Sequence, residues 1–161
     1  MPDLRRSILV LLLTAAPAGA QTATATLSAN LDPLAKLSLS STSLSFPDTN
    51  PDQSSQVPAA AGAVTITAKA RATAGSTVTL TVLASGDLRS GVNTIPTSAI
   101  TWTVAGPGFI AGTLSATTAQ PVGSWSSSGV HIGTQNYLFR NLWTYASGTY
   151  TVSLLYTLTS P

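Results

Sequence analysis

The chain has 161 residues, a formal net charge of +2 and only 7% charged residues. So few basic side chains cannot form the strongly positive surface that nucleic-acid-binding proteins use, and we expect no nucleic-acid partner. The chain contains no cysteine, so an exported form would depend on core packing, on sheet hydrogen bonds or on pairing with other chains.

The first twenty residues have the order of a secretory signal peptide. Two arginines precede an apolar run over residues 8–16, and a proline and small residues follow it. This run is shorter than the ~20 residues that a bilayer-spanning helix needs, so a cleaved signal is favoured over a membrane anchor. We expect residues 1–20 to be removed and residues 21–161 to form one domain without a membrane span. The mature protein would be secreted, periplasmic or at the cell surface.

Apolar and polar residues alternate through the rest of the chain, and clusters of Gly, Pro, Asn and Ser separate the alternating segments. No segment has a helical period. The alternation predicts strands over residues 22–31, 35–46, 63–71, 76–84, 98–105, 109–116, 135–145 and 148–159.

The spacing of these strands also predicts how they connect. The second strand is expected to kink near Ser41, and the break at Ala74–Gly75 predicts a hairpin between the third and fourth strands. Residues 47–62 and 121–129 are expected to be loops. Because no crossover helix is available for parallel strands, the pattern predicts an all-β protein with two packed antiparallel sheets.

Three short motifs resemble a known family. The chain opens on the Thr/Ala-rich segment TATATLSANL (residues 22–31), continues through Leu44-x-Phe46 to VTITAKARATAGSTVTLTV, and closes on a Gly148-x-Tyr150 strand. This order resembles the secreted spore coat protein U and fimbrial (pilin-like) subunit group. Lys36 and Ala70 stand where that group usually carries cysteines.

The resemblance implies an immunoglobulin-like antiparallel β-sandwich of about seven to nine strands. It also implies a domain that lacks its last strand and is completed by the N-terminal extension of another subunit, through β-augmentation. The chain would then be a structural or adhesive cell-surface protein of the pilus or coat type, associating with itself or with other surface subunits. The predicted strand-pairing residues are the donor residues Ala23, Ala25, Leu27, Ala29 and Leu31 and the acceptor residues Tyr150, Val152, Leu154 and Tyr156.

The same N-terminal strand could instead pair within its own chain and close a monomeric sandwich. Periodicity does not distinguish pairing in cis from pairing in trans, because both bury the same face. A monomeric sandwich would be a secreted module that binds carbohydrate or protein. Trp125, in a serine-rich segment, is the predicted solvent-facing ligand contact.

Catalytic chemistry is not expected, and neither is a cofactor. His131 is the only histidine, so neither a histidine metal site nor a Ser-His-acid arrangement is easily built. After removal of residues 1–20, only four scattered aspartates remain. Asp48, Asn50 and Asp52 have the spacing that starts a calcium loop, but the turn glycine and the bidentate glutamate of such a loop are missing. An Asx turn is the simpler interpretation.

The last group of interest is aromatic. Tyr137, Phe139, Trp143 and Tyr145 would share one face if residues 135–145 formed a single strand. Exposed, they would be a platform for sugars or a protein partner; buried, they would pack in the core against Trp102 and Tyr150. We favour the core.

Overall fold

The computed structural model describes residues 24–161, so the predicted signal peptide and Ala23 lie outside the described residues. The chain divides at Asn30 into two units. In the first unit, residues 24–30 form no strand and have exposed side chains. The second unit, Leu31–Pro161, contains all the described strands and one short 3₁₀ turn. Within the described part of the chain, no helix has the length and apolar character needed to cross a bilayer.

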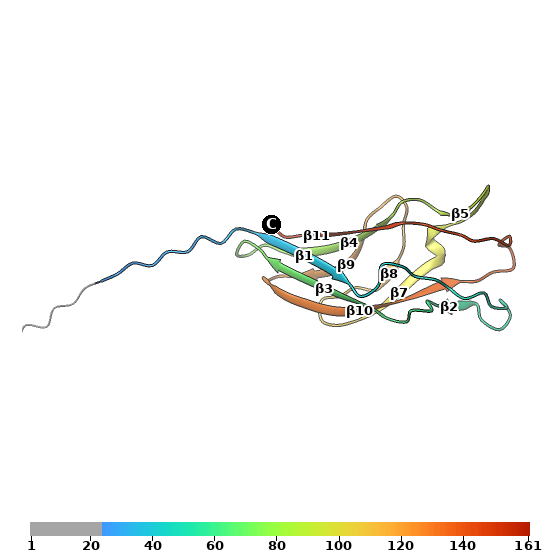
Figure 1. Ribbon diagram of the computed structural model, residues 1–161, viewed down its shortest axis with the longest axis horizontal. Coiled ribbons are helices and arrows are strands. Elements are labelled where there is room, and N and C mark those ends of the chain that lie inside the picture. Colours follow the sequence, from blue (N-terminus) through green and yellow to red (C-terminus); the bar gives the residue numbers. More distant parts are fainter. Residues whose placement is uncertain (1–23) are drawn as a thin grey trace, which may run out of the picture. The chain divides into compact units, whose positions relative to one another are not determined.

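Two antiparallel sheets, of six and three strands, form most of the second unit, as predicted, and the protein is an all-β sandwich (Figure 1). Seven strands have six residues or more and four have only two or three. The six-stranded sheet has the order β1 (Leu34–Leu39), β3 (Val64–Arg71), β10 (Gly129–Arg140), β7 (Ile100–Ala105) and β8 (Gly112–Thr113), with β2 (Gln56–Pro58) also paired to β10. The three-stranded sheet has the order β11 (Leu154–Thr159), β4 (Val78–Ala84) and β9 (Gln120–Trp125). A hairpin of β5 (Leu88–Ser90) and β6 (Asn93–Ile95) precedes the 3₁₀ turn at Thr97–Ala99.

The core lies between the two sheets and follows the predicted alternation. In β3, every second residue from Val64 to Ala70 is buried, and in β4 the same holds from Val78 to Ala84. The residues between them are intermediate or exposed and are mostly threonine. A pleated strand presents alternate side chains to opposite faces, so this pattern is what a half-buried strand requires.

The prediction that β3 and β4 form a hairpin is wrong. The turn at Gly75 carries the chain from one sheet to the other, because β3 pairs with β1 and β10 whereas β4 pairs with β11 and β9. Alternation and a glycine turn mark two strands and a reversal. They do not say whether the two strands pair or face each other across a core.

Several predicted strand limits also change. The predicted strand over residues 22–31 is absent from the described residues 24–31. The second strand ends at Leu39, just before the expected kink, and residues 109–116 contribute only β8. The predicted strand over residues 135–145 begins earlier, at Gly129, and ends at Arg140. Much of the predicted loop over residues 121–129 is strand β9, whose serine and glycine content concealed it.

Candidate functional site

The sandwich is closed along one side, between the loop after β7 and strand β9. The Ile110 amide donates to the Val122 carbonyl at 2.8 Å, and the Ser124 amide donates to the Gly108 carbonyl at 2.9 Å. The inward side chains on this side are well buried: Phe109 is 9% exposed and Val122 is 0% exposed. Backbone hydrogen bonds therefore join the loop between β7 and β8 to β9, and the inward side chains here are shielded from solvent.

The opposite side of the sandwich is different, and we call it the open seam. It lies between β1, which pairs only with β3, and β11, which pairs only with β4. The two strands are neighbours in space (Figure 1). Among the described residues no backbone hydrogen bond joins β1 to β11. The two sheets are bonded just beyond one end of the seam, where the Thr73 amide donates to the Pro161 carbonyl at 2.7 Å. Each strand thus presents one backbone edge without a strand partner, which is the arrangement that accepts an added strand.

Side chains along the β11 edge of the open seam face the core but remain partly exposed. Tyr156 lies opposite Val82, and Leu158 lies opposite Leu80, so each pair shares the inner face. Val82 and Leu80 are 0% exposed, whereas the two β11 residues are only partly buried. The inward side chains of β4 are thus fully buried, whereas those of the edge strand β11 are only partly buried.

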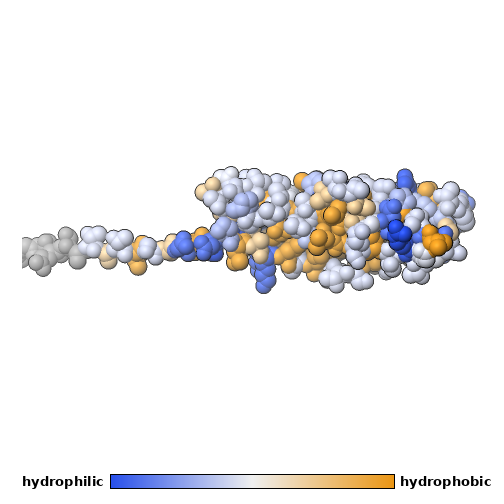
Figure 2. Space-filling model, turned by 90° about the horizontal axis from the view of Figure 1, so that it is seen from above, coloured by the Kyte–Doolittle hydropathy of each residue, from blue (hydrophilic) through white to orange (hydrophobic). Residues whose placement is uncertain are grey.

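The β1 edge repeats this gradient. Leu39 lies opposite Ile66, which is 0% exposed, and is itself only partly buried. Figure 2 shows the molecule from above, with hydrophobic side chains at the surface along the length of the sandwich. The partly buried apolar residues that border the seam or continue its two edges are Leu37, Leu39, Leu44, Phe46, Tyr150, Val152, Leu154, Tyr156 and Leu158.

The predicted acceptor residues belong to this set. Tyr150, Val152, Leu154 and Tyr156 alternate with exposed residues, as the sequence indicated. Only the last two lie in β11, because the strand begins at Leu154 and Thr151 makes an isolated bridge to Arg89. The β1 half of the seam was not predicted, because sequence alternation does not say which strand lies across from β11.

The predicted donor residues that the structure describes lie in a stretch that forms no strand. Ala25, Leu27 and Ala29 have exposed side chains, and Leu27 is 97% exposed. Leu31 is 67% exposed. The strand needed for pairing in cis is absent from residues 24–31 of this single chain.

A polar cluster lies in the core beneath the seam. Tyr156 reaches from β11 to β10, where its hydroxyl donates to Gln135 Oε1 at 2.6 Å and also contacts the Tyr137 hydroxyl. The Tyr137 hydroxyl donates to the same oxygen at 3.2 Å. Burial raises the pKa of both tyrosines above the ordinary tyrosine value, so their hydroxyls hold their protons more tightly than in water. These bonds join the edge strand of one sheet to the centre of the other.

Trp125 was predicted to face solvent, and this prediction is wrong. Its side chain is 8% exposed, its indole Nε1 donates to the Pro107 carbonyl at 3.0 Å, and it packs edge-on against Phe109. His131 stacks on the other side of the indole, with ring centroids 4.4 Å apart. The lone histidine is thus part of the packing around Trp125, at the closed side of the sandwich.

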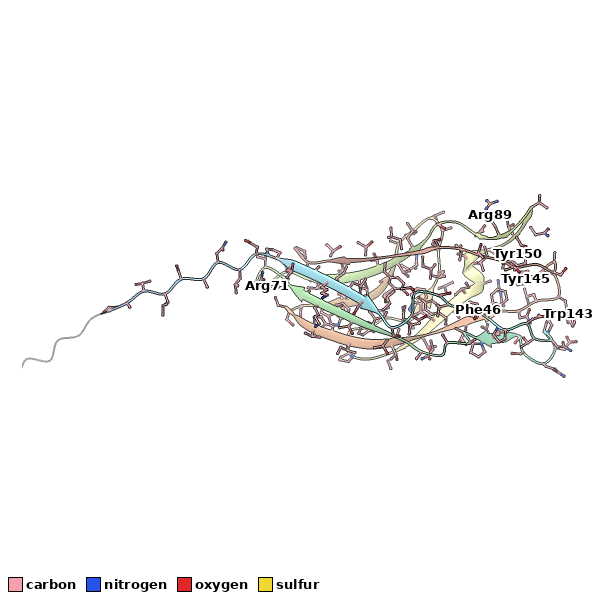
Figure 3. The ribbon with its side chains drawn as sticks, in the orientation of Figure 1. Phe46, Arg71, Arg89, Trp143, Tyr145 and Tyr150 are labelled. Atoms are coloured by element: carbon pink, nitrogen blue, oxygen red, sulfur yellow. The ribbon has the colours of Figure 1, made fainter. Side chains whose placement is uncertain are left out.

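The aromatic run divides between core and surface. Tyr137 is 2% exposed and packs against Trp102, as predicted. Phe139 and Tyr145 are partly buried, and the Phe139 ring packs against both Phe46 and Tyr145. The expectation of one shared face is wrong, because β10 ends at Arg140 and the later residues follow a different path. Figure 3 shows Trp143 and Tyr145 at the end of the sandwich opposite Arg71.

Trp143 is the exposed member of the run. It is 68% exposed, and its indole Nε1 donates to Asp52 Oδ1 at 2.9 Å. In the predicted calcium segment, the Asp52 amide donates to Asn50 Oδ1 at 2.9 Å, so the Asx turn is confirmed. Asp48 is exposed nearby in sequence. Among the described residues, no group of three or more His, Cys, Asp or Glu side chains gathers as a metal site would.

The chain was compared with known protein families, with curated proteins and with solved structures, and no comparison gives a match. The resemblance to spore coat protein U and fimbrial subunits therefore stays an expectation. The geometry of the open seam is the strongest evidence about function.

Proposed function

We propose that the protein is an exported structural or adhesive subunit of the cell surface that assembles by β-strand complementation. In this proposal, residues 22–31 of one copy enter the open seam of another. The observation that supports it is the difference between the two sides of the sandwich. One side is closed by backbone hydrogen bonds to β9, whereas on the other side β1 and β11 share no backbone hydrogen bond along their length and are lined by partly exposed apolar side chains. Such an edge is a ready template for pairing with another chain.

The chemistry of the donor segment suits the seam. An inserted strand can form backbone hydrogen bonds with both edges, while alternate side chains cover the apolar rows. Residues 22–31 supply that alternation, with alanine and leucine on one face and mainly threonine and serine on the other. They contain no proline, which would remove a backbone donor from the ladder.

The first experiment is the mass in solution, measured by size exclusion with light scattering. The chain from Gln21 is compared with a chain that starts at Asp32. We expect ladders or filaments from the longer chain and monomers from the shorter one. A longer chain that is a stable monomer, and a shorter one that unfolds, would show pairing in cis and overturn the proposal.

A peptide experiment tests the acceptor separately. A peptide of residues 22–31 should bind the chain that starts at Asp32 and stabilise it by about 2.7 kcal/mol at a hundredfold excess over Kd. The control is the same peptide with Leu27→Asp, which places a charge on the inserted face and should not bind. Equal effects of the two peptides would mean that the seam does not contact the peptide face that carries Leu27.

The acceptor strand offers a matched pair of variants. Leu154 faces the core at the seam, whereas Leu155 is 66% exposed on the other face of the same strand. We expect Leu154→Ser to reduce assembly and peptide binding and Leu155→Ser to leave both unchanged. Both variants change the same residue type in the same strand, so a general effect on strand propensity would appear in both.

A second candidate function is a monomeric secreted module that binds carbohydrate or protein. The observation that favours it is Trp143, an exposed indole held in place by Asp52. An aromatic face in a fixed orientation can stack on a sugar ring. Retention of a monomeric chain on immobilised glycans, lost in Trp143→Ala, would support this function over assembly.

A further inference from the structure

The outer face of the six-stranded sheet carries a concentrated group of basic residues. In the register of β1 and β3, Lys36 lies directly opposite Lys69, and Leu34 lies opposite Arg71. In the register of β3 and β10, Val130 lies opposite Lys69. Cross-strand partners share a face, so these side chains form a row across three neighbouring strands.

This face points away from the core. Ala68 and Ala70, which flank Lys69 in β3, are 0% and 8% exposed, whereas Lys36 and Lys69 are both exposed. We call the group the lysine patch; its members are Leu34, Lys36, Lys69, Arg71, Val130 and Ile132.

The concentration of charge is unusual for this chain. Lys36 and Lys69 are the only lysines in the sequence, and with Arg71 they make three of the five basic residues after residue 20. Strands β1, β3 and β10 contain no aspartate or glutamate. The nearest acidic residue in sequence is Asp32, just before β1, whose backbone carbonyl accepts a hydrogen bond from Arg71 Nε, so the two lysines are the members of the patch that face each other. Like charges directly opposite each other in a sheet are destabilising, so the pairing of Lys36 with Lys69 is unfavourable unless an anionic partner lies over it.

Exposed apolar side chains lie among these charges. Leu34 is 63% exposed, Val130 is 59% exposed and Ile132 is 57% exposed. A soluble polyanion would contact the basic residues but would leave these apolar side chains in water. A bilayer surface would contact both the basic and the apolar residues, because anionic headgroups attract Lys and Arg while apolar side chains enter the boundary between headgroups and acyl chains.

We propose that the lysine patch binds the surface of a bilayer that contains anionic lipids. The inference does not depend on strand complementation, because the open seam uses backbone edges and inner faces, whereas the patch uses the outer face. Anionic lipid headgroups attract each nearby basic residue by about 1 kcal/mol, which is about a fivefold change in partitioning. Two lysines together therefore change it about 25-fold.

Flotation with vesicles in a density gradient tests the proposal, because assembled protein without lipid does not float. The chain from Gln21 is used, because it retains the compact unit Leu31–Pro161 and lacks the apolar run of residues 8–16. We expect binding to vesicles of phosphatidylglycerol and phosphatidylcholine that is weakened by salt, and little binding to phosphatidylcholine alone. Equal binding to both kinds of vesicle, or none to either, would overturn the proposal.

Two double variants separate the patch from net charge. Lys36→Ala with Lys69→Ala should weaken binding to the anionic vesicles about 25-fold. Arg89→Ala with Arg140→Ala removes the same charge outside the patch and should leave binding nearly unchanged; Figure 3 shows Arg89 far from Arg71. Equal losses in the two double variants would mean that net charge alone drives binding, and the patch would be rejected.

A third comparison distinguishes a bilayer from a soluble polyanion. Val130→Thr with Ile132→Thr keeps β-branched residues and all charges, so the sheet should be preserved. It should weaken binding to anionic vesicles without affecting retention of the protein by dextran sulfate. Retention by dextran sulfate without any vesicle binding would assign the patch to a polyanion and overturn the lipid proposal.

Discussion

The closed side of the sandwich depends on a glycine. Gly108 has φ +77°, and a Cβ placed there would lie 2.4 Å from Trp125 Nε1 and 2.8 Å from the Ser124 carbonyl oxygen. Both distances are shorter than atoms tolerate, and neither neighbour can move freely. Trp125 is buried and bonded to the Pro107 carbonyl, and the backbone of Ser124 is held in β9. We therefore predict that Gly108→Ala disrupts the closure.

The magnitude follows from a comparison with Gly75. Gly75 has φ +82° and nothing within 4 Å of its ideal Cβ, so Gly75→Ala should cost only the positive-φ penalty of about 1–2 kcal/mol. Gly108→Ala has the same penalty. It also forces repacking of the Trp125 indole, at about 1–3 kcal/mol, and weakens a hydrogen bond worth about 1 kcal/mol. The difference between the two variants should be about 2–4 kcal/mol.

Urea denaturation of both variants measures this difference, with near-UV circular dichroism to follow the environment of the tryptophans. Gly108→Ala should lower the unfolding midpoint and change the near-UV spectrum, whereas Gly75→Ala should leave the spectrum unchanged. Equal losses of stability in the two variants would refute the reasoning, because the backbone angle alone would then explain both.

Three further predictions concern the core and the surface. Burial raises the pKa of Tyr137 and of Tyr156 above about 10, their value in the unfolded chain, so their contribution to stability is complete below pH 10 and is lost as pH rises beyond it. The urea concentration at the unfolding midpoint should decrease as pH rises above about 10. The decrease should be smaller in the double variant with phenylalanine at both positions. Trp143→Phe should remove most of the acrylamide-quenchable fluorescence, because the other two tryptophans are only 2% and 8% exposed; unchanged quenching would contradict the described exposure. Leu80→Ala, at a position that is 0% exposed, should cost about 2–5 kcal/mol in thermal or urea unfolding, whereas Val92→Ala, at 96% exposure, should stay within about 0.5 kcal/mol.

Much of the local structure was predictable from the sequence. Alternation identified β3 and β4 and the residues that each buries, and it assigned the inner face of the terminal segment from Tyr150 to Leu158. It also identified half of the open seam, since the acceptor residues all face inward. These features are local, because the two-residue period of a strand determines which side chains share a face whatever the strand pairs with.

Only the tertiary structure decided which strands pair and which edges stay open. Gly75 lies in a turn both in the sequence prediction and in the structure, yet in the structure β3 and β4 belong to different sheets. The burial of Trp125 depends on residues 107–109, which approach β9 from elsewhere in the chain. The opposition of Lys36 and Lys69 likewise depends on the register of two strands separated by a long loop. Pairing, register and closure arise from contacts between distant segments, and a period of two residues is compatible with many such arrangements.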